Sequence, residues 1–212
     1  MSESKREIVL NLLPEIKQIQ DEKLQEKVIA CWEEAIEFRG WTEELLRNMP
    51  FTLLAENVEI TFIDHVRAVC LMCVACDDVL DNVHAERKTK VNRDYLIAGA
   101  LLADVGKLLE FDIVEGQPVK SDYGKHIRHP FSGVGLAFKH DLPSEVMHVI
   151  ATHSKEGAGE KRLAESSIVK KGCVSTICST CLKKKPKIRM PIPIPSNIFF
   201  LICATVFSLS GK

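Results

Sequence analysis

The stretch Leu101-Leu102-Ala103-Asp104-Val105-Gly106-Lys107-Leu108-Leu109 carries the strongest clue to the fold. It lies in residues 92–110, where nearly every position from 98 to 109 is apolar or small, a pattern typical of a central, buried helix. A carboxylate in such a place costs several kcal/mol unless it is paired or coordinates a metal ion. Lys107 follows Asp104 by one helical turn and offers it a partner. Asp104 is therefore either half of a buried ion pair or a metal ligand.

The composition is that of a globular protein. The chain has 212 residues, of which 46% are hydrophobic and 27% are charged, enough for one domain with extensions. Lys and Arg number 28 against 29 Asp and Glu, and this balance argues against a nucleic-acid polymer as partner. A nucleotide remains allowed as a substrate.

The N-terminus, MSESKREIVLNLL, does not have the pattern of a signal peptide, because it mixes charges and lacks a long apolar run. The eight cysteines are then expected in a reducing compartment, the cytoplasm. Three of them at helical spacing favour core packing over a thiolate metal site: Cys70, Cys73 and Cys76. A weaker alternative is a loose three-cysteine metal site, made by Cys173, Cys178 and Cys181.

Apolar periodicity predicts an all-α fold. Asp21 is a candidate N-cap for a helix that Gly40 ends, and Thr42 is a candidate N-cap for the next. Around Gly116 the sequence predicts a small turn or hairpin. The helical segments are expected at residues 5–20, 21–40, 42–50, 57–82, 92–110, 130–140 and 143–153.

The chain divides by composition into three parts. We expect a helical N-terminal extension packed on the core over residues 1–50, the main domain over 51–170, and an atypical, irregular tail over 171–212. The tail is first basic, then proline-rich, then apolar from Ile198 to Leu209. That apolar stretch is short for a transmembrane helix, so membrane contact is expected only if residues 188–209 form a tail anchor.

Three of the seven histidines are candidate metal ligands. His65, His129 and His153 lie in or beside predicted helices with apolar neighbours, and imidazoles on rigid helices bind transition metals well. The other positions considered read as surface or helix-end residues: His84, His140 and His148.

Four short motifs together resemble the HD superfamily of metal-dependent phosphohydrolases. Ala103-Asp104-Val105-Gly106-Lys107 is similar to the HD-[IV]-G-K motif of that family. The other three are Phe62-Ile63-Asp64-His65-Val66-Arg67, His129-Pro130-Phe131-Ser132-Gly133 and Ile150-Ala151-Thr152-His153. Each motif is weak alone, but their order along residues 57–170 is fairly specific. The resemblance implies an HD-domain helical bundle with a short hairpin or loop insertion.

The resemblance also implies a site. A divalent metal ion (Mn, Fe, Zn, Ni, Co or Mg) would be bound by His65 and Asp104, with His129 and His153 at a second position. Lys107, with Asp104, would be catalytic, by facing a phosphate or polarising the nucleophile. Substrate phosphate would be bound by Arg128 and His126.

Two departures from the family pattern weaken the expected site. The family's histidine before the motif's Asp is Ala103 here, and alanine cannot bind a metal. The family's final Asp belongs on a later helix, yet this chain has no Asp after Asp141 and no Glu after Glu165. We therefore expect two ligands, and the helix that carries the second of them, to be missing.

Three functions remain open from the sequence. The first is metal-dependent hydrolysis of a phosphoester, a nucleotide or other small phosphorylated metabolite, by an impaired enzyme. The second is a di-iron oxygenase of the HD type, which the extra histidines allow. The third is a degenerate HD domain that acts as a ligand-binding or regulatory module. A homodimer is compatible with each of them.

Overall fold

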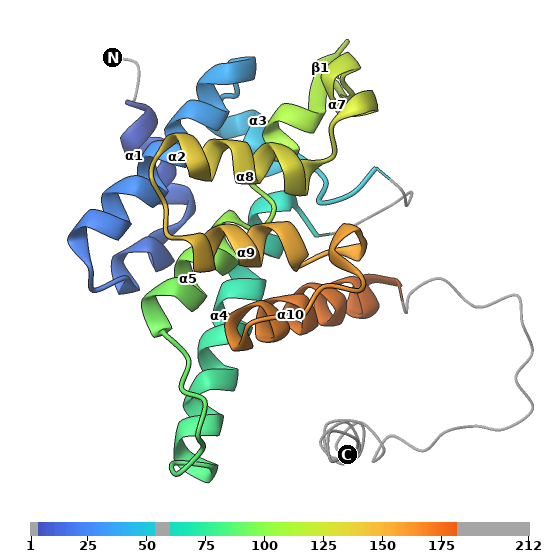
Figure 1. Ribbon diagram of the computed structural model, residues 1–212. Coiled ribbons are helices and arrows are strands. Elements are labelled where there is room, and N and C mark those ends of the chain that lie inside the picture. Colours follow the sequence, from blue (N-terminus) through green and yellow to red (C-terminus); the bar gives the residue numbers. More distant parts are fainter. Residues whose placement is uncertain (1–3, 54–59, 182–212) are drawn as a thin grey trace, which may run out of the picture. The chain divides into compact units, whose positions relative to one another are not determined.

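The fold is a helical bundle with a two-stranded hairpin, as the all-α prediction requires (Figure 1). The computed structural model describes residues 4–53 and 60–181, with side chains in the last helix described up to residue 174. The predicted tail beyond Cys181 lies outside the described residues. The elements are α1 Lys5–Leu12, the 3-10 helix η1 Pro14–Gln18, α2 Glu22–Arg39, α3 Glu43–Asn48, α4 Phe62–Val83, α5 Arg93–Leu102, α6 Lys107–Glu110, β1 Phe111–Val114, β2 Gln117–Lys120, α7 Asp122–His126, α8 His129–Lys139, α9 Ser144–Thr152, the 3-10 helix η2 Lys155–Gly157 and α10 Ala164–Cys181.

Several helix ends form where capping residues predict them. Asp21 accepts hydrogen bonds from the first backbone N–H groups of α2, and Thr42 does the same for α3. Gly40 ends α2 in the left-handed region at φ 67°, where a side chain would be strained. Pro14 breaks the predicted helix 5–20 into α1 and η1, because proline cannot continue the hydrogen bonds of an α-helix.

The predicted hairpin is present. β1 and β2 pair antiparallel with Val114 opposite Gln117, so Glu115 and Gly116 form a two-residue turn. Both turn residues have positive φ, 52° and 74°, as in the turns that match the twist of paired strands. Buried Phe111 attaches the hairpin to the core.

The predicted helix over 92–110 is interrupted, and the interruption contains Asp104. α5 ends at Leu102, residues 103–106 form turns, and α6 begins at Lys107. Gly106 lies so close to α8 that a Cβ atom there would be 2.1 Å from the carbonyl oxygen of His129. The missing side chain at Gly106 therefore allows the turn with Asp104 to lie against the N-terminus of α8.

The core is built around α5, whose residues from Leu96 to Leu102 are all buried. α5 packs against α2, α4, α9 and α10. α10 lies along α4 and beside α9, as Figure 1 shows in orange. The expectation that this closing helix is missing is thus wrong, and the expected domain end at residue 170 falls inside α10.

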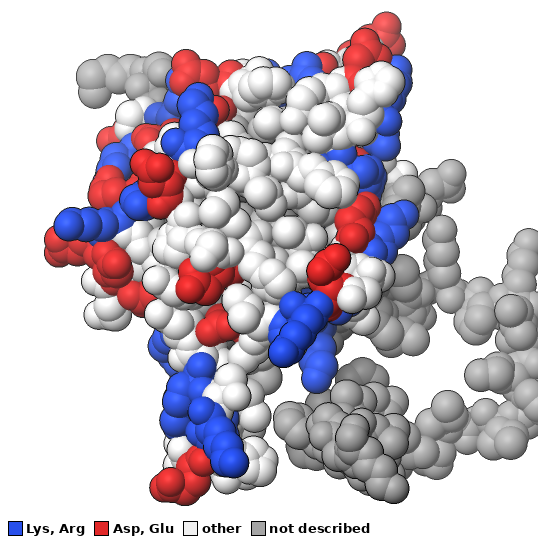
Figure 2. Space-filling model, viewed as in Figure 1, with Lys and Arg blue, Asp and Glu red and all other residues white. Residues whose placement is uncertain are grey.

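The surface carries charges of both signs. On the face seen in Figure 2, Lys and Arg side chains are interspersed with Asp and Glu along the margins, while much of the middle is uncharged. Two exposed phenylalanines of α8 add to the apolar surface, Phe131 (62% exposed) and Phe138 (73%). No described helix has both the length and the apolar character needed to cross a membrane.

Gly106→Ala tests the close approach of the turn to α8. We expect it to lower the free energy of unfolding by at least about 2 kcal/mol, because the new methyl group would overlap backbone atoms that cannot move freely. Gly135→Ala in α8 is the control, since no atom lies within 4 Å of the position of its Cβ. It should raise stability by up to about 1 kcal/mol through helix propensity. Urea denaturation measures both, and equal stability of the two variants would contradict the packing described.

Candidate metal centre

Four polar side chains converge on the buried carboxylate of Asp104. His65 Nε2 lies 3.0 Å from Oδ2, and Lys107 Nζ lies 3.0 Å from Oδ1. The Nε2 atoms of His129 and His153 lie 3.3 and 3.6 Å from the same Oδ1. Asp104 itself is only 4% exposed. The structure therefore brings Asp104 together with the other three residues that the sequence predicts as metal ligands, the histidines at 65, 129 and 153.

Each of these residues is held at the end or turn of a helix. His65 lies in the first turn of α4, and Asp104 lies in the turn between α5 and α6. His129 is the first residue of α8, and His153 follows the last residue of α9. Helix ends fix the backbone of a residue while leaving its side chain free to face a neighbouring helix.

Hydrogen bonds fix the tautomer of two imidazoles. Glu110 Oε2 lies 3.0 Å from His129 Nδ1 and also accepts a hydrogen bond from the His129 backbone N–H. The carbonyl oxygen of Ile150 lies 2.8 Å from His153 Nδ1. Since both oxygens are acceptors, both Nδ1 atoms are assigned the proton. In the neutral rings, both Nε2 atoms then carry lone pairs.

These lone pairs meet at one point. His129 Nε2 and His153 Nε2 are 3.3 Å apart, and both face Asp104 Oδ1. Two lone pairs and a carboxylate oxygen repel one another unless a cation, either a proton or a metal ion, lies among them. The three donor atoms lie within 4.8 Å of one another, so a single metal ion could bind to all three.

The local electrostatics favour an ionised carboxylate and a neutral imidazole. Burial alone would raise the pKa of Asp104, but the positive charge of Lys107 opposes it, and this pKa lies well below its usual value. Burial lowers the pKa of His129, although Glu110 opposes that shift. A neutral imidazole beside a carboxylate is the form that binds a metal, so the donor set fits a divalent ion.

A second set of donors shares Asp104. His65, Asp104 and Cys173 each offer one ligand atom, all within 4.8 Å of one another and all buried. The His65 ring stacks on Phe51 with centroids 5.0 Å apart. Its Nδ1 is buried and has no hydrogen-bond partner among the described residues.

The alternative of a buried ion pair is also partly realised. Lys107 pairs with Asp104 and donates a second hydrogen bond, of 2.8 Å, to the carbonyl oxygen of Phe51. The pair does not stand alone, because three histidines also surround the carboxylate. A structural ion pair needs none of them.

The two residues predicted to bind substrate are placed differently. Arg128 adjoins His129 and pairs with Glu110 and Glu156. His126 is exposed in the last turn of α7. Arg128 is therefore connected to the metal centre through Glu110, whereas no contact of His126 with Asp104 is described.

Sequence reasoning missed two members of the site. Glu110 is 1% exposed and hydrogen-bonded to His129, and it directly follows the apolar run that contains Asp104. A second acid at the end of that run was the available signal. The sequence predicts Cys173 only as part of a loose three-cysteine metal site with Cys178 and Cys181, whose side chains lie outside the described part of the chain.

Ala103 occupies the position directly before Asp104, where the family motif has a histidine. Its side chain is 1% exposed and belongs to the hydrophobic core. Cys70 and Cys73 are also fully buried there, as expected for core cysteines, whereas Cys76 is exposed.

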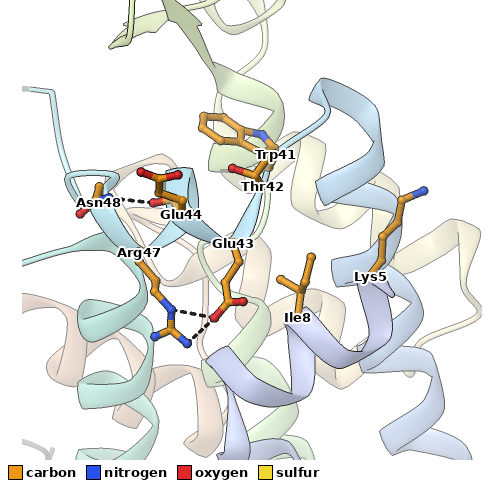
Figure 3. Close-up of a pocket in the computed structure, with 8 residues that line it drawn as sticks. All are labelled: Lys5, Ile8, Trp41, Thr42, Glu43, Glu44, Arg47 and Asn48. Carbon is orange, nitrogen blue, oxygen red and sulfur yellow. Dashed lines mark hydrogen bonds and ion pairs between the residues drawn. The ribbon is translucent and has the colours of Figure 1, made fainter. Parts of the chain in front are cut away.

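A surface hollow elsewhere has none of this chemistry. Figure 3 shows its lining, which comes from α1, α3 and the segment before α3. Within the hollow, Arg47 donates a hydrogen bond to the carboxylate of Glu43. Asn48 donates a hydrogen bond to the carbonyl oxygen of Glu44. The hollow shares no residue with the donors around Asp104.

Comparisons with known proteins give a matching family and a matching relative. The family model described as HD domain matches residues 62–204, which include every donor named above. A dihydroneopterin 2',3'-cyclic phosphate phosphodiesterase of Methanocaldococcus jannaschii is 33% identical over 91 residues, 43% of this chain. The matched region spans 35% of that relative's length. No solved structure matches the chain.

Glu110→Gln tests the role of Glu110 as an orienting partner. An amide can present its NH2 group to Nδ1 and so favour the wrong tautomer, which should weaken metal binding about 10- to 100-fold. Glu156→Gln is the control, because Glu156 also pairs with Arg128 but has no described bond to His129. Competition with a chelating dye measures both affinities. Equal affinities in the two variants would show that Glu110 does not act through His129.

Proposed function

The chain belongs to the HD domain family, and from that membership we propose that it is a metal-dependent phosphohydrolase acting on a small phosphoester. One observation carries the proposal: the lone pairs of His129 and His153 face each other and the same carboxylate oxygen of Asp104, a convergence that a cation bound among the three atoms would stabilise. The set of one carboxylate and two imidazoles suits a divalent ion that keeps open positions for water and substrate.

The name of the relative suggests a narrower substrate class. That protein is named as a phosphodiesterase of dihydroneopterin 2',3'-cyclic phosphate. We therefore propose a small phosphodiester as the first substrate class to test. The near balance of charge and the interspersed charges on the face in Figure 2 agree with a small substrate rather than a nucleic-acid polymer.

Each residue of the site has a proposed role. Asp104, His129 and His153 would hold the metal, which lowers the pKa of its water and polarises a phosphoryl oxygen. Glu110 keeps the proton of His129 on Nδ1 and so keeps Nε2 free to bind. Lys107 places a positive charge 3.0 Å from Asp104, where it can also attract the phosphate.

Arg128 and His126 remain the proposed phosphate-binding residues. The Arg128 side chain is 36% exposed and lies beside His129, so its guanidinium can reach both solvent and the site. For His126 the support is its basic, exposed position three residues before His129 in the sequence.

A degenerate binding module is the second candidate. Ala103 favours it, because a core methyl group stands where the family has a histidine. The di-iron oxygenase alternative has only the two extra histidines in its favour. A homodimer and a cytoplasmic location stay predictions, as does the division into residues 1–50, 51–170 and 171–212.

Hydrolysis of small phosphodiesters tests the proposal. The full chain with added Mn²⁺ or Co²⁺ should release product from bis-p-nitrophenyl phosphate or a 2',3'-cyclic nucleotide. Asp104→Asn should reduce the rate at least about 100-fold. Removing a residue that only supports a metal ligand costs up to about 100-fold, and removing a ligand itself should cost no less. His148→Gln on α9 is the control and should keep the rate. Rates that are equal in all three proteins would refute phosphohydrolysis at this site.

Ala103→His separates an impaired enzyme from a binding module. If the site is a weakened phosphohydrolase, restoring the imidazole should raise metal affinity and hydrolysis together, provided that the variant folds, which circular dichroism checks. Tighter metal binding without any gain in hydrolysis would favour the binding module.

A further inference from the structure

We propose that Cys173 is a metal ligand, and that His65, Asp104 and Cys173 form a half-site that selects a thiophilic ion such as Zn²⁺ or Co²⁺ over Mg²⁺ or Mn²⁺. The inference rests on the proposed function, since it concerns the same centre. It assigns a role to a residue that departs from the family pattern.

The geometry of the three donors carries the proposal. One nitrogen of His65, one carboxylate oxygen of Asp104 and the sulfur of Cys173 lie within 4.8 Å of one another. Cys173 is 7% exposed and His65 is 2% exposed. Buried cysteines are common in cores, but Cys31, Cys70 and Cys73 join no such donor group in the described part of the chain.

His65 supplies an independent observation. Its ring is buried against Phe51, and Nδ1 has no partner among the described residues. With the proton on Nε2, the lone pair of Nδ1 is left unsatisfied. With the proton on Nδ1, that N–H has no described acceptor, and the lone pair of Nε2 faces the carboxylate of Asp104 at 3.0 Å. A metal ion bound by Nε2 and Asp104 would remove the repulsion between that lone pair and the carboxylate, with Nδ1 carrying the proton.

α10 places the sulfur at this point and holds it there. Glu165 accepts a hydrogen bond of 2.8 Å from the backbone N–H of Asn92, and Ser166 is hydrogen-bonded to Thr152. Ser166, Val169 and Cys173 are all buried and are spaced to share one face of the helix. The thiol thus lies on a helix that is anchored at its N-terminal turn and packs on α4.

The family's final carboxylate is expected on this helix, and Cys173 takes its place in the donor group. A carboxylate suits Mg²⁺ and Mn²⁺, whereas a thiolate suits Zn²⁺ and related ions. On binding, the metal replaces the thiol proton, which passes to solvent, and no electron is transferred. The change from oxygen to sulfur therefore alters which ion the half-site prefers.

Titration with Co²⁺ under reducing, anaerobic conditions tests the proposal directly. The full chain should develop a thiolate-to-cobalt charge-transfer band in the near ultraviolet. Cys31→Ala is the matched control, because Cys31 is equally buried but bonds to the carbonyl oxygen of Leu136 in α8. It should keep the band, and Cys173→Ala should lose it.

Cys173→Asp keeps the proposal testable if the alanine variant does not fold. It should bind Co²⁺ without the band and shift the ratio of Zn²⁺ to Mn²⁺ affinity toward Mn²⁺ by at least about tenfold. A band that survives in Cys173→Asp, or its absence from wild-type protein loaded with Co²⁺, would overturn the role of Cys173. Neither result depends on hydrolysis, so the proposed function could fail while this inference stands.

Discussion

The buried carboxylate of Asp104 is the constraint around which the structure is arranged. Its desolvation is unfavourable, and one lysine and three histidines provide the compensation. To reach them, the chain breaks the helix at Leu102 and brings the turn against α8 where Gly106 has no side chain. Had Asp104 served only as one half of an ion pair, Lys107 would have been sufficient.

Much of the fold follows from local sequence signals. Asp21, Gly40 and Thr42 mark helix ends that the structure confirms, because capping depends on residues close in sequence. The break at residues 103–106 could not be predicted in this way, since it depends on contact between Gly106 and the distant α8. The same limit applies to α10, which the apolar pattern does not predict and whose position is set by packing on α4.

The candidate site shows the same division between local and distant information. The motifs identify His65, Asp104, His129 and His153, and the structure brings these four together. Glu110 and Cys173 required the three-dimensional contacts, because neither has a motif that marks it. The structure also differs at the positions of the two family ligands that this sequence lacks. Ala103 lies in the hydrophobic core, whereas the sulfur of Cys173 lies within reach of Asp104 on the helix where the family's final carboxylate is expected.

The metal content of the purified protein tests the central claim most directly. Full-length protein prepared without chelators should contain about one equivalent or more of a transition metal by plasma mass spectrometry, and Asp104→Ala should lose it. Wild-type protein that is metal-free, and that takes up no added metal beyond what Asp104→Ala takes up, would contradict the account. Asp104 would then be an ion-pair residue whose histidine neighbours carry the compensating protons.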